Sequence, residues 1–155
     1  MTEAPAACEI WFYHLERSSL EQVLPDLLEK TLARGWRAQV RARDEARLDD
    51  LDERLWTWKD DAFLAHGKAG ELHEARQPIV LTTGQANENA AQALFLVDGA
   101  EPGDVTGYVR CITLFDGRDE AATAEARVRW KGFAAQGLPV SYWRQTEDGR
   151  WEKKA

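Results

Sequence analysis

Residues 9–35 read EIWFYHLERSSLEQVLPDLLEKTLARG, and this stretch decides the fold class. Its first seven residues are bulky and aromatic, which predicts a buried strand over 9–15. Ser18 and Ser19 each have a Glu or Gln three positions later, the spacing of a capping box at the start of a helix. Leucines at helical spacing follow up to Gly35, which can take the left-handed position after a helix. A strand that leads into an amphipathic helix indicates an α/β domain.

The alternation of strands and helices continues along the rest of the chain. Apolar and β-branched runs predict further strands over 36–42, 78–83, 93–99, 104–116 and 138–145. Periodicity leaves a helix open as the alternative for 104–116. Asp44 and Asp119 precede apolar stripes and predict the starts of two more helices, whereas 59–77 is expected to be irregular. These elements predict a three-layer α/β domain with a largely parallel central sheet.

Composition limits the kinds of partner that the protein can bind. The chain has 155 residues, of which 44% are hydrophobic, and a formal net charge of −7. This size and composition are typical of one globular domain, while the net charge argues against a wide nucleic-acid surface, which would need many Lys and Arg. Residues 121–155 nevertheless carry seven basic and four acidic side chains. An acidic partner is therefore expected to bind there.

The cysteines and the chain start indicate the compartment. Cys8 and Cys111 lie inside apolar runs without a CxxC spacing, which favours reduced thiols in the core. Residues 1–8 lack the features of a signal peptide, and every apolar run is shorter than the roughly 20 residues of a membrane span. We expect a cytoplasmic protein that does not contact a membrane.

The residues favour a binding protein over an enzyme. His14, His66 and His73 stand outside any metal-ligand or catalytic motif. The turn at Gly84 follows a strand, but it lacks the further glycines and the lysine of a phosphate loop. The acidic residues at 49–53 could hold a metal, but they lie between Arg47 and Arg54 on a predicted helix, which is typical of a solvated face. We therefore expect no catalytic residue, no cofactor and no metal.

Two stretches are candidates for partner binding. Residues 51–67, LDERLWTWKDDAFLAHG, place Trp56, Trp58 and Phe63 in a polar segment of weak periodicity, where aromatic side chains can be exposed to a partner. Residues 126–133, ARVRWKGF, place basic and aromatic side chains side by side on a helix. A guanidinium beside apolar rings can bind a terminal carboxylate while the rings contact apolar side chains.

These stretches, together with FYHL, LLEKTLARGWR, PIVLTTG, LFLVDGA and the C-terminal LPVSYWRQTEDGRWEKKA, resemble the chi subunit of bacterial DNA polymerase III holoenzyme. The resemblance covers nearly the whole chain. It implies a single α/β/α Rossmann-like domain over 1–155 with a mostly parallel (mixed) sheet, a flexible N-terminus at 1–8 and a C-terminal tail at 146–155. It also implies a noncatalytic accessory protein of the clamp loader, located at replication forks.

The resemblance further implies two partners and the residues that bind them. The psi subunit would bind at Trp56, Phe63 and His66. The acidic C-terminal tail of single-stranded DNA-binding protein would bind at Arg127, Trp130, Lys131 and Phe115, with Arg127 on the terminal carboxylate. Some members of the family carry a basic residue one turn before this arginine, where Thr123 stands here. DNA would be contacted only indirectly.

Two alternative functions stay open. The psi-type surface can serve a helicase of the iron–sulfur type in DNA repair, since chi-like proteins pair with such a helicase. In the other alternative, the domain is a nucleotide-dependent enzyme that uses the Gly84 turn.

Overall fold

Short apolar strands and capped helices alternate along the chain, as the sequence predicts. The computed structural model describes residues 8–57, 65–71, 74–87, 89–148 and 150–154. In chain order the elements are β1 (Glu9–Leu15), α1 (Leu20–Ala33), β2 (Ala38–Arg41), α2 (Glu45–Trp56), β3 (Gly67–Lys68), the 3-10 helix η1 (Glu74–Arg76), β4 (Ile79–Thr82), β5 (Ala93–Leu96), β6 (Arg110–Asp116), α3 (Glu120–Ala135), β7 (Val140–Gln145) and β8 (Trp151–Lys153).

The strands form one mixed sheet in the order β3-β4-β2-β5-β6-β1-β7-β8. Every neighbouring pair is parallel except β7 and β8, which are antiparallel. Leu15 at the end of β1 pairs with Asp116 at the end of β6, so the carboxyl ends of the central strands meet at one edge. This arrangement confirms the predicted α/β/α Rossmann-like sandwich with a mostly parallel sheet.

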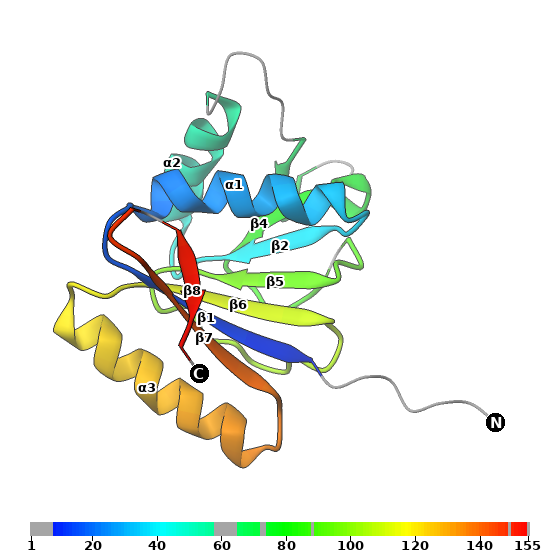
Figure 1. Ribbon diagram of the computed structural model, residues 1–155. Helices are drawn as coiled ribbons and strands as arrows, with labels where there is room; N and C mark the ends of the chain where they lie inside the picture. Colours follow the sequence, from blue (N-terminus) through cyan, green and yellow to red (C-terminus); the bar gives the residue numbers. More distant parts are fainter. Residues whose placement is uncertain (1–7, 58–64, 72–73, 88, 149, 155) are drawn as a thin grey trace.

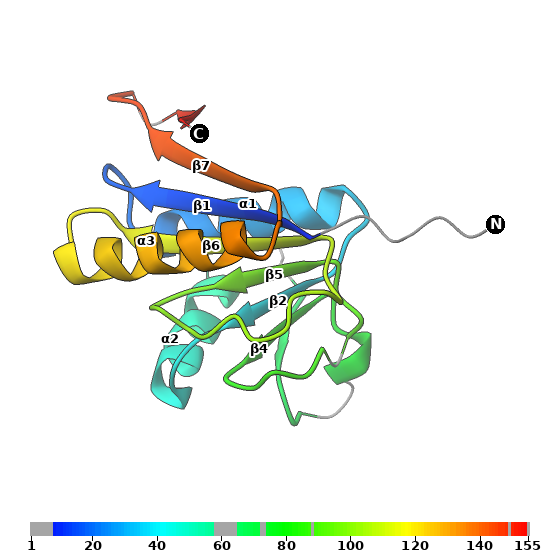
Figure 2. The same cartoon turned by 90° about the horizontal axis from the view of Figure 1, so that it is seen from below.

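Helices cover both faces of the sheet. Figure 1 shows α1 and α2 on one face and α3 on the other, and Figure 2 shows α3 lying along the sheet beside β6 and β1. The side chains of β1 alternate accordingly, since Tyr13 and Leu15 belong to the core under α1 and α2, whereas Ile10 and Phe12 belong to the core under α3. Burial of both faces explains why β5, with the sequence ALFL, is apolar throughout.

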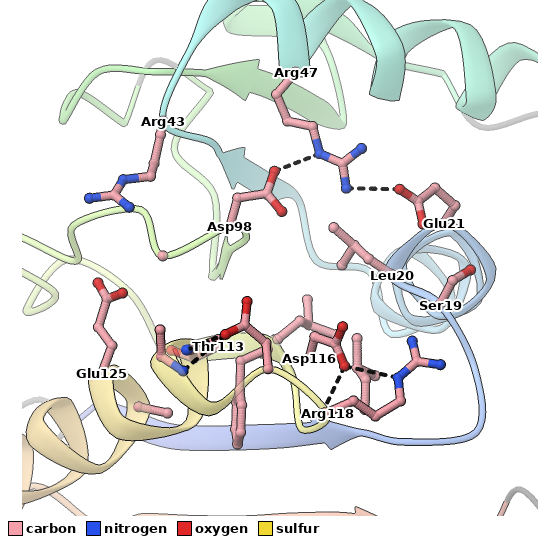
Figure 3. Close-up of a pocket in the computed structure, with 18 of the residues that line it drawn as sticks. Ser19, Leu20, Glu21, Arg43, Arg47, Asp98, Thr113, Asp116, Arg118 and Glu125 are labelled. Atoms are coloured by element: carbon pink, nitrogen blue, oxygen red, sulfur yellow. Dashed lines mark hydrogen bonds and ion pairs between the residues drawn. The ribbon is translucent and has the colours of Figure 1, made fainter.

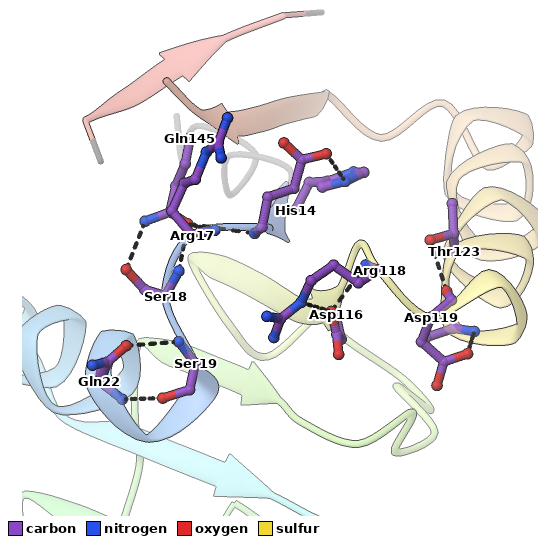
Figure 4. Close-up of polar contacts among 12 residues, drawn as sticks. His14, Arg17, Ser18, Ser19, Gln22, Asp116, Arg118, Asp119, Thr123 and Gln145 are labelled. Atoms are coloured by element: carbon purple, nitrogen blue, oxygen red, sulfur yellow. Dashed lines mark hydrogen bonds and ion pairs between the residues drawn. The ribbon is translucent and has the colours of Figure 1, made fainter. Parts of the chain in front are cut away.

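Side chains fix the starts of the helices at the predicted positions. Ser19 accepts a hydrogen bond from the Gln22 amide, and the Gln22 side chain accepts one from the Ser19 amide, which completes the capping box of α1 (Figure 4). Asp44 caps α2 by accepting from the Arg47 amide, and Asp119 caps α3 by accepting from the amides of Ala121 and Ala122. At the other end of α1, Gly35 has a φ of +81°, a value that favours glycine.

Several predicted boundaries are wrong by a few residues. The strand expected from residue 104 begins at Arg110, because Asp104 instead accepts hydrogen bonds from the amide and the hydroxyl of Thr106 and makes a turn. The strand expected over 93–99 ends at Leu96, and Asp98 has a φ of 53°, which is incompatible with a strand. Cys8, the last residue of the predicted N-terminal segment 1–8, is buried, and residues 1–7 lie outside the described residues.

Further order is found in two stretches that the sequence left without regular structure. Strand β3 and the helix η1 fall within the expected irregular region 59–77. Within the expected C-terminal tail 146–155, β8 pairs with β7, and the side chain of Trp151 packs against the core. The end of the chain therefore extends the sheet.

The two cysteines are free and buried, in agreement with the sequence. Burial raises the pKa of the Cys8 thiol to about 11 and that of Cys111 further still. Both thiols are therefore protonated at neutral pH. Over the described ranges, the helices are too short or too polar to cross a membrane.

Candidate functional site

Helix α3 and the sheet beneath it form an open apolar cavity of about 260 Å³. The predicted apolar stripe of α3 turns Ala126 and Phe133 into the core and leaves Trp130 half-buried at the cavity edge. The walls of the cavity come from β1, β6, α3 and β7. They consist of Phe12, Phe115, Thr123, Ala126, Arg127, Trp130, Lys131 and Tyr142.

Aromatic rings form the inner walls of this cavity. The Trp130 ring lies 5.6 Å from Phe12 and 5.8 Å from Tyr142, measured between ring centroids. Phe115 lies 6.2 Å from Tyr142 and completes the aromatic wall. These separations are typical of tilted and edge-to-face aromatic contacts, which hold the rings in place. The cavity is therefore a formed apolar surface that can accept apolar side chains of a ligand.

Two cations stand at the rim of the cavity. Arg127 and Lys131 are one helical turn apart on α3, and both are exposed. Among the described residues, neither has an ion-pair partner, whereas the neighbouring Arg129 bonds Glu125 at 2.7 Å. Thr123, one turn before Arg127, adds a neutral hydroxyl to the rim. An anionic group would thus meet two available positive charges beside the apolar walls.

A polar cluster behind the cavity holds Tyr142. The Tyr142 hydroxyl shares a hydrogen bond with Nδ1 of His14, and Nε2 of His14 lies 3.1 Å from Oε1 of Glu16. Glu16 is in turn bonded by Arg144 at 2.6 Å. Burial lowers the pKa of His14, and the Arg144 hydrogen bond lowers the pKa of Glu16. At neutral pH His14 is therefore uncharged, and it positions a wall of the cavity.

The second predicted site lies at the end of α2. Trp56 is 51% exposed, and the centroid of its ring lies 4.4 Å from that of His66 in a tilted contact. His66 is buried, with its Nε2 atom 2.9 Å from Asp52. Phe63, the third residue predicted to bind psi, and Trp58 lie outside the described residues. The structure therefore places an exposed tryptophan on a histidine at the predicted surface.

The residues that the sequence offered for catalysis, phosphate binding or metal binding lie outside the α3 cavity or outside the described residues. The Gly84 amide donates to the Thr82 hydroxyl at 2.9 Å, and Gly84 is absent from the walls of the α3 cavity. His73 lies outside the described residues. Within the described ranges, His, Cys, Asp and Glu form no cluster of three or more suited to a metal ion.

Comparison with known proteins assigns the family. Residues 8–141 match the family described as "DNA polymerase III chi subunit, HolC". This chain belongs to the chi family. A DNA polymerase III subunit chi of Pseudomonas aeruginosa is 30% identical over 119 residues, which is 77% of this chain and 82% of that protein. One of Haemophilus influenzae is 25% identical over 124 residues, or 79% and 85% of the two chains.

The family confirms the resemblance found in the sequence. Chi is an accessory subunit of DNA polymerase III in DNA replication, and this chi-family chain is such a subunit. All four residues predicted to bind an acidic tail line one cavity, although they come from two separate elements. Their role in binding stays a prediction.

Sequence reasoning missed two walls of the cavity in this chi-family chain. Phe12 and Tyr142 lie on strands that are far apart in sequence but paired side by side, with Phe12 opposite Tyr142 in the register of β1 and β7. Side chains alternate between the two faces along EIWFYHL, so Phe12 lies on the same sheet face as Ile10, and this pattern could have placed Phe12 under α3. No local pattern could have identified Tyr142 as a wall residue, because the strands beside β7 depend on the order of strands in the sheet.

Proposed function

We propose that this protein links the clamp loader to single-stranded DNA-binding protein by holding the acidic C-terminal tail of that protein in the α3 cavity. The psi subunit connects it to the clamp loader through the surface around Trp56. The protein itself is noncatalytic, acts at replication forks in the cytoplasm and contacts DNA only through its partners. The single observation that carries the proposal is the pair of exposed cations, without ion pairs among the described residues, at the rim of an aromatic cavity.

Arg127 and Lys131 have different parts in tail binding. The planar guanidinium of Arg127 can donate two parallel hydrogen bonds to the terminal carboxylate, and this geometry is specific. The ammonium of Lys131 acts as a point charge on the acidic residues that precede the terminus. Trp130, Phe115 and Tyr142 form the apolar side that receives the last side chains of the tail.

Titration with a synthetic tail peptide tests this proposal. The peptide is used with a free C-terminal carboxylate and with an amidated C-terminus, and its binding is measured by calorimetry. We expect the amide to lose roughly 1.5–3 kcal/mol of binding free energy, the usual contribution of a charge-assisted hydrogen bond. The Arg127→Ala variant should lose the same amount of binding free energy for the peptide with a free carboxylate, relative to the unchanged protein. This variant should therefore bind the free and the amidated peptide equally.

Two control variants separate this site from general effects. Val128→Ala changes a residue of α3 that is 70% exposed and lies outside the cavity wall, and Lys30→Ala removes a charge from α1. Both should bind the tail peptide like the unchanged protein. Equal binding of the amidated and free peptides by the unchanged protein would refute a carboxylate site at Arg127.

The proposed psi surface rests on the exposure of Trp56. A large aromatic side chain that is half exposed on an ordered helix end is typical of a partner contact. Co-purification from cells identifies the partner, and psi is the expected one. Recovery of an iron–sulfur helicase on the same surface would favour the alternative role in DNA repair.

The enzyme alternative is tested separately. Thermal unfolding with a nucleoside triphosphate should show no stabilisation that depends on Gly84 if the protein is noncatalytic. The amide of Gly84 already donates to Thr82, which supports the binding role over a phosphate loop at this turn.

A further inference from the structure

A second and larger cavity, of about 530 Å³, lies at the carboxyl edge of the sheet (Figure 3). The neighbouring strands β1 and β6 end here at Leu15 and Asp116. The chain then leaves β1 for α1 on one face and leaves β6 for α3 on the other face (Figures 1 and 2). In open α/β sheets, the crevice between two such diverging connections is the usual place for a ligand.

A buried hydroxyl without a partner lies in the wall of this cavity. Thr113 is one of its lining residues and is only 4% exposed. The Oγ1 atom of Thr113 is buried and has no hydrogen-bond partner in the part of the chain that the structure describes. Buried polar atoms are almost always hydrogen-bonded, because an unmade bond costs free energy. An oxygen atom of a ligand would supply the missing partner.

Among the described residues, three of the four guanidiniums that line the cavity are paired with carboxylates. Arg47 is paired with Asp98 at 2.5 Å and with Glu21 at 2.9 Å. Arg118 and Arg129, the other paired cations of the wall, likewise bond neighbouring carboxylates. Arg43 is exposed at the mouth and has no ion pair among the residues described. Arg43 is therefore the group that an anion would meet.

Capping side chains already bond one or two of the amides at each helix start. The side chain of Ser19 accepts from the first turn of α1, and that of Asp44 accepts from the first turn of α2. Asp119 accepts from the amides of Ala121 and Ala122 in α3. The exposed Arg43 side chain can bind the anion, and the carboxylates of Asp98 and Glu125 in the same wall can accept hydrogen bonds from ligand hydroxyl groups.

The balance of charge limits how anionic the ligand can be. Five carboxylates, those of Glu21, Asp98, Asp116, Asp119 and Glu125, line the cavity beside four guanidiniums. A group with several phosphates would be repelled, whereas one phosphate can pair with Arg43. Leu20, which is partly exposed, adds an apolar surface for a flat ring, and the buried Leu15 and Leu114 lie behind it in the same wall.

We propose that this cavity binds a nucleoside monophosphate, with the phosphate on Arg43, the ribose hydroxyl groups on Thr113 and the neighbouring carboxylates, and the base against the leucines. The cavity volume is within the range of small-molecule sites. This site is distinct from the α3 cavity, although Phe115 and Ala126 contribute to both walls. A ligand here would contact the first half of the helix that carries Arg127.

Calorimetric titration with AMP, adenosine and ATP tests the site on the full chain. AMP should bind, and adenosine and ATP should each bind at least roughly tenfold more weakly, a difference of about 1.4 kcal/mol. Arg43→Gln should weaken AMP binding by at least about tenfold and should leave tail-peptide binding unchanged. Thr113→Val removes the unpaired hydroxyl at nearly constant shape, so it should weaken AMP binding by several-fold without lowering the melting temperature.

Lys30→Gln is the matched control, because it removes an exposed charge from the far part of α1, and it should bind AMP normally. Failure of the unchanged protein to bind AMP at roughly millimolar concentrations, equal binding of adenosine, or normal AMP binding by Arg43→Gln or Thr113→Val would each overturn the proposal. None of these results depends on binding of the tail peptide, so failure here leaves the proposed replication function untouched.

Discussion

Arg127 and Arg129 lie two residues apart on α3 and have opposite environments. Arg129 is mostly buried and bonds Glu125 and the carbonyl oxygens of Gly99 and Ala100, each at 2.7 Å. Arg127 is exposed at the rim of the aromatic cavity and, within the described ranges, has no carboxylate partner. The same type of side chain therefore anchors the helix at one position and stays available for a ligand at the other.

Replacement of Arg129 should affect stability rather than binding. Arg129→Ala leaves Glu125 and two backbone carbonyl oxygens without their charged donor, so we expect a loss of roughly 1.5–3 kcal/mol in the free energy of unfolding. Urea denaturation measures this loss. Arg127→Ala, the matched control on the same helix, should change it by less than about 0.5 kcal/mol. Equal destabilisation by both variants would contradict the division of roles between the two arginines.

The salt dependence of tail-peptide binding should distinguish the role of Arg127 from that of Lys131. Arg127→Ala should lose most tail-peptide binding at low and at raised salt, because paired hydrogen bonds to a carboxylate are short-ranged. The loss in Lys131→Ala should be smaller and should shrink as salt screens the acidic stretch of the peptide. Calorimetry at two ionic strengths measures both effects. Equal losses that salt abolishes at both positions would indicate a diffuse basic face instead of a carboxylate site.

A methyl group at position 117 should damage the cluster behind the cavity. A Cβ atom on Gly117 would overlap the buried ring of His14, the partner of Tyr142. Gly117→Ala should therefore lower the unfolding free energy by roughly 1–3 kcal/mol and weaken tail binding through Tyr142.

Gly132 provides the matched control for this substitution. It lies inside α3, and a Cβ atom there meets no other atom within 4 Å. Gly132→Ala should therefore stabilise the protein by roughly 0.5–1 kcal/mol, since alanine favours the helix. Thermal or urea unfolding compares the two variants, and a neutral effect of Gly117→Ala would show that His14 moves away at no cost.

The stability of the protein should fall as the solution becomes mildly acidic. Burial lowers the pKa of His14 from its ordinary value of 6.5, so the unfolded chain takes up this proton before the folded one. The unfolded state is then favoured as the pH falls below about 6.5, and the stability present at neutral pH decreases. Urea unfolding between about pH 5 and 7 measures this slope.

His14→Asn is the variant that isolates this effect. It should flatten the pH dependence of the unfolding free energy in that range. Glu16 and Asp116 face the same histidine, but Arg144 and the Arg118 amide hold their pKa values below normal, so these carboxylates titrate at lower pH. An unchanged slope in the variant would assign the effect to another group.

Truncation of Trp56 should weaken binding of the psi subunit. Because Trp56 is exposed, Trp56→Ala should leave the fold intact, and loss of an aromatic hot spot should cost about 2 kcal/mol or more, a change in affinity of roughly thirtyfold. Phe63→Ala is predicted to act in the same way. Co-elution with psi provides the measurement, with Val128→Ala as the exposed control. Unchanged co-elution of both variants would remove this surface from the interface.

Local patterns in the sequence determined the kinds and order of the elements. The helix α1 starts at Ser19 and ends before Gly35 as predicted, because capping and the left-handed turn depend on residues within one turn of each other. The spacing of Arg127, Trp130 and Lys131 likewise placed them together, since residues three and four apart share a helix face. Boundaries failed at residue 104, where an aspartate turn competes with a strand of similar composition.

Only the tertiary structure decided which distant residues meet. Phe12 and Tyr142 complete the α3 cavity because β7 pairs with β1. The local sequences of β1 and β7 do not specify that these two strands are neighbours. The cavity with Thr113 and Arg43 likewise exists because the connections after β1 and β6 leave on opposite faces of the sheet. Turn and helix signals act over a few bonds, whereas strand order is set by how all the helices and strands together bury their apolar faces.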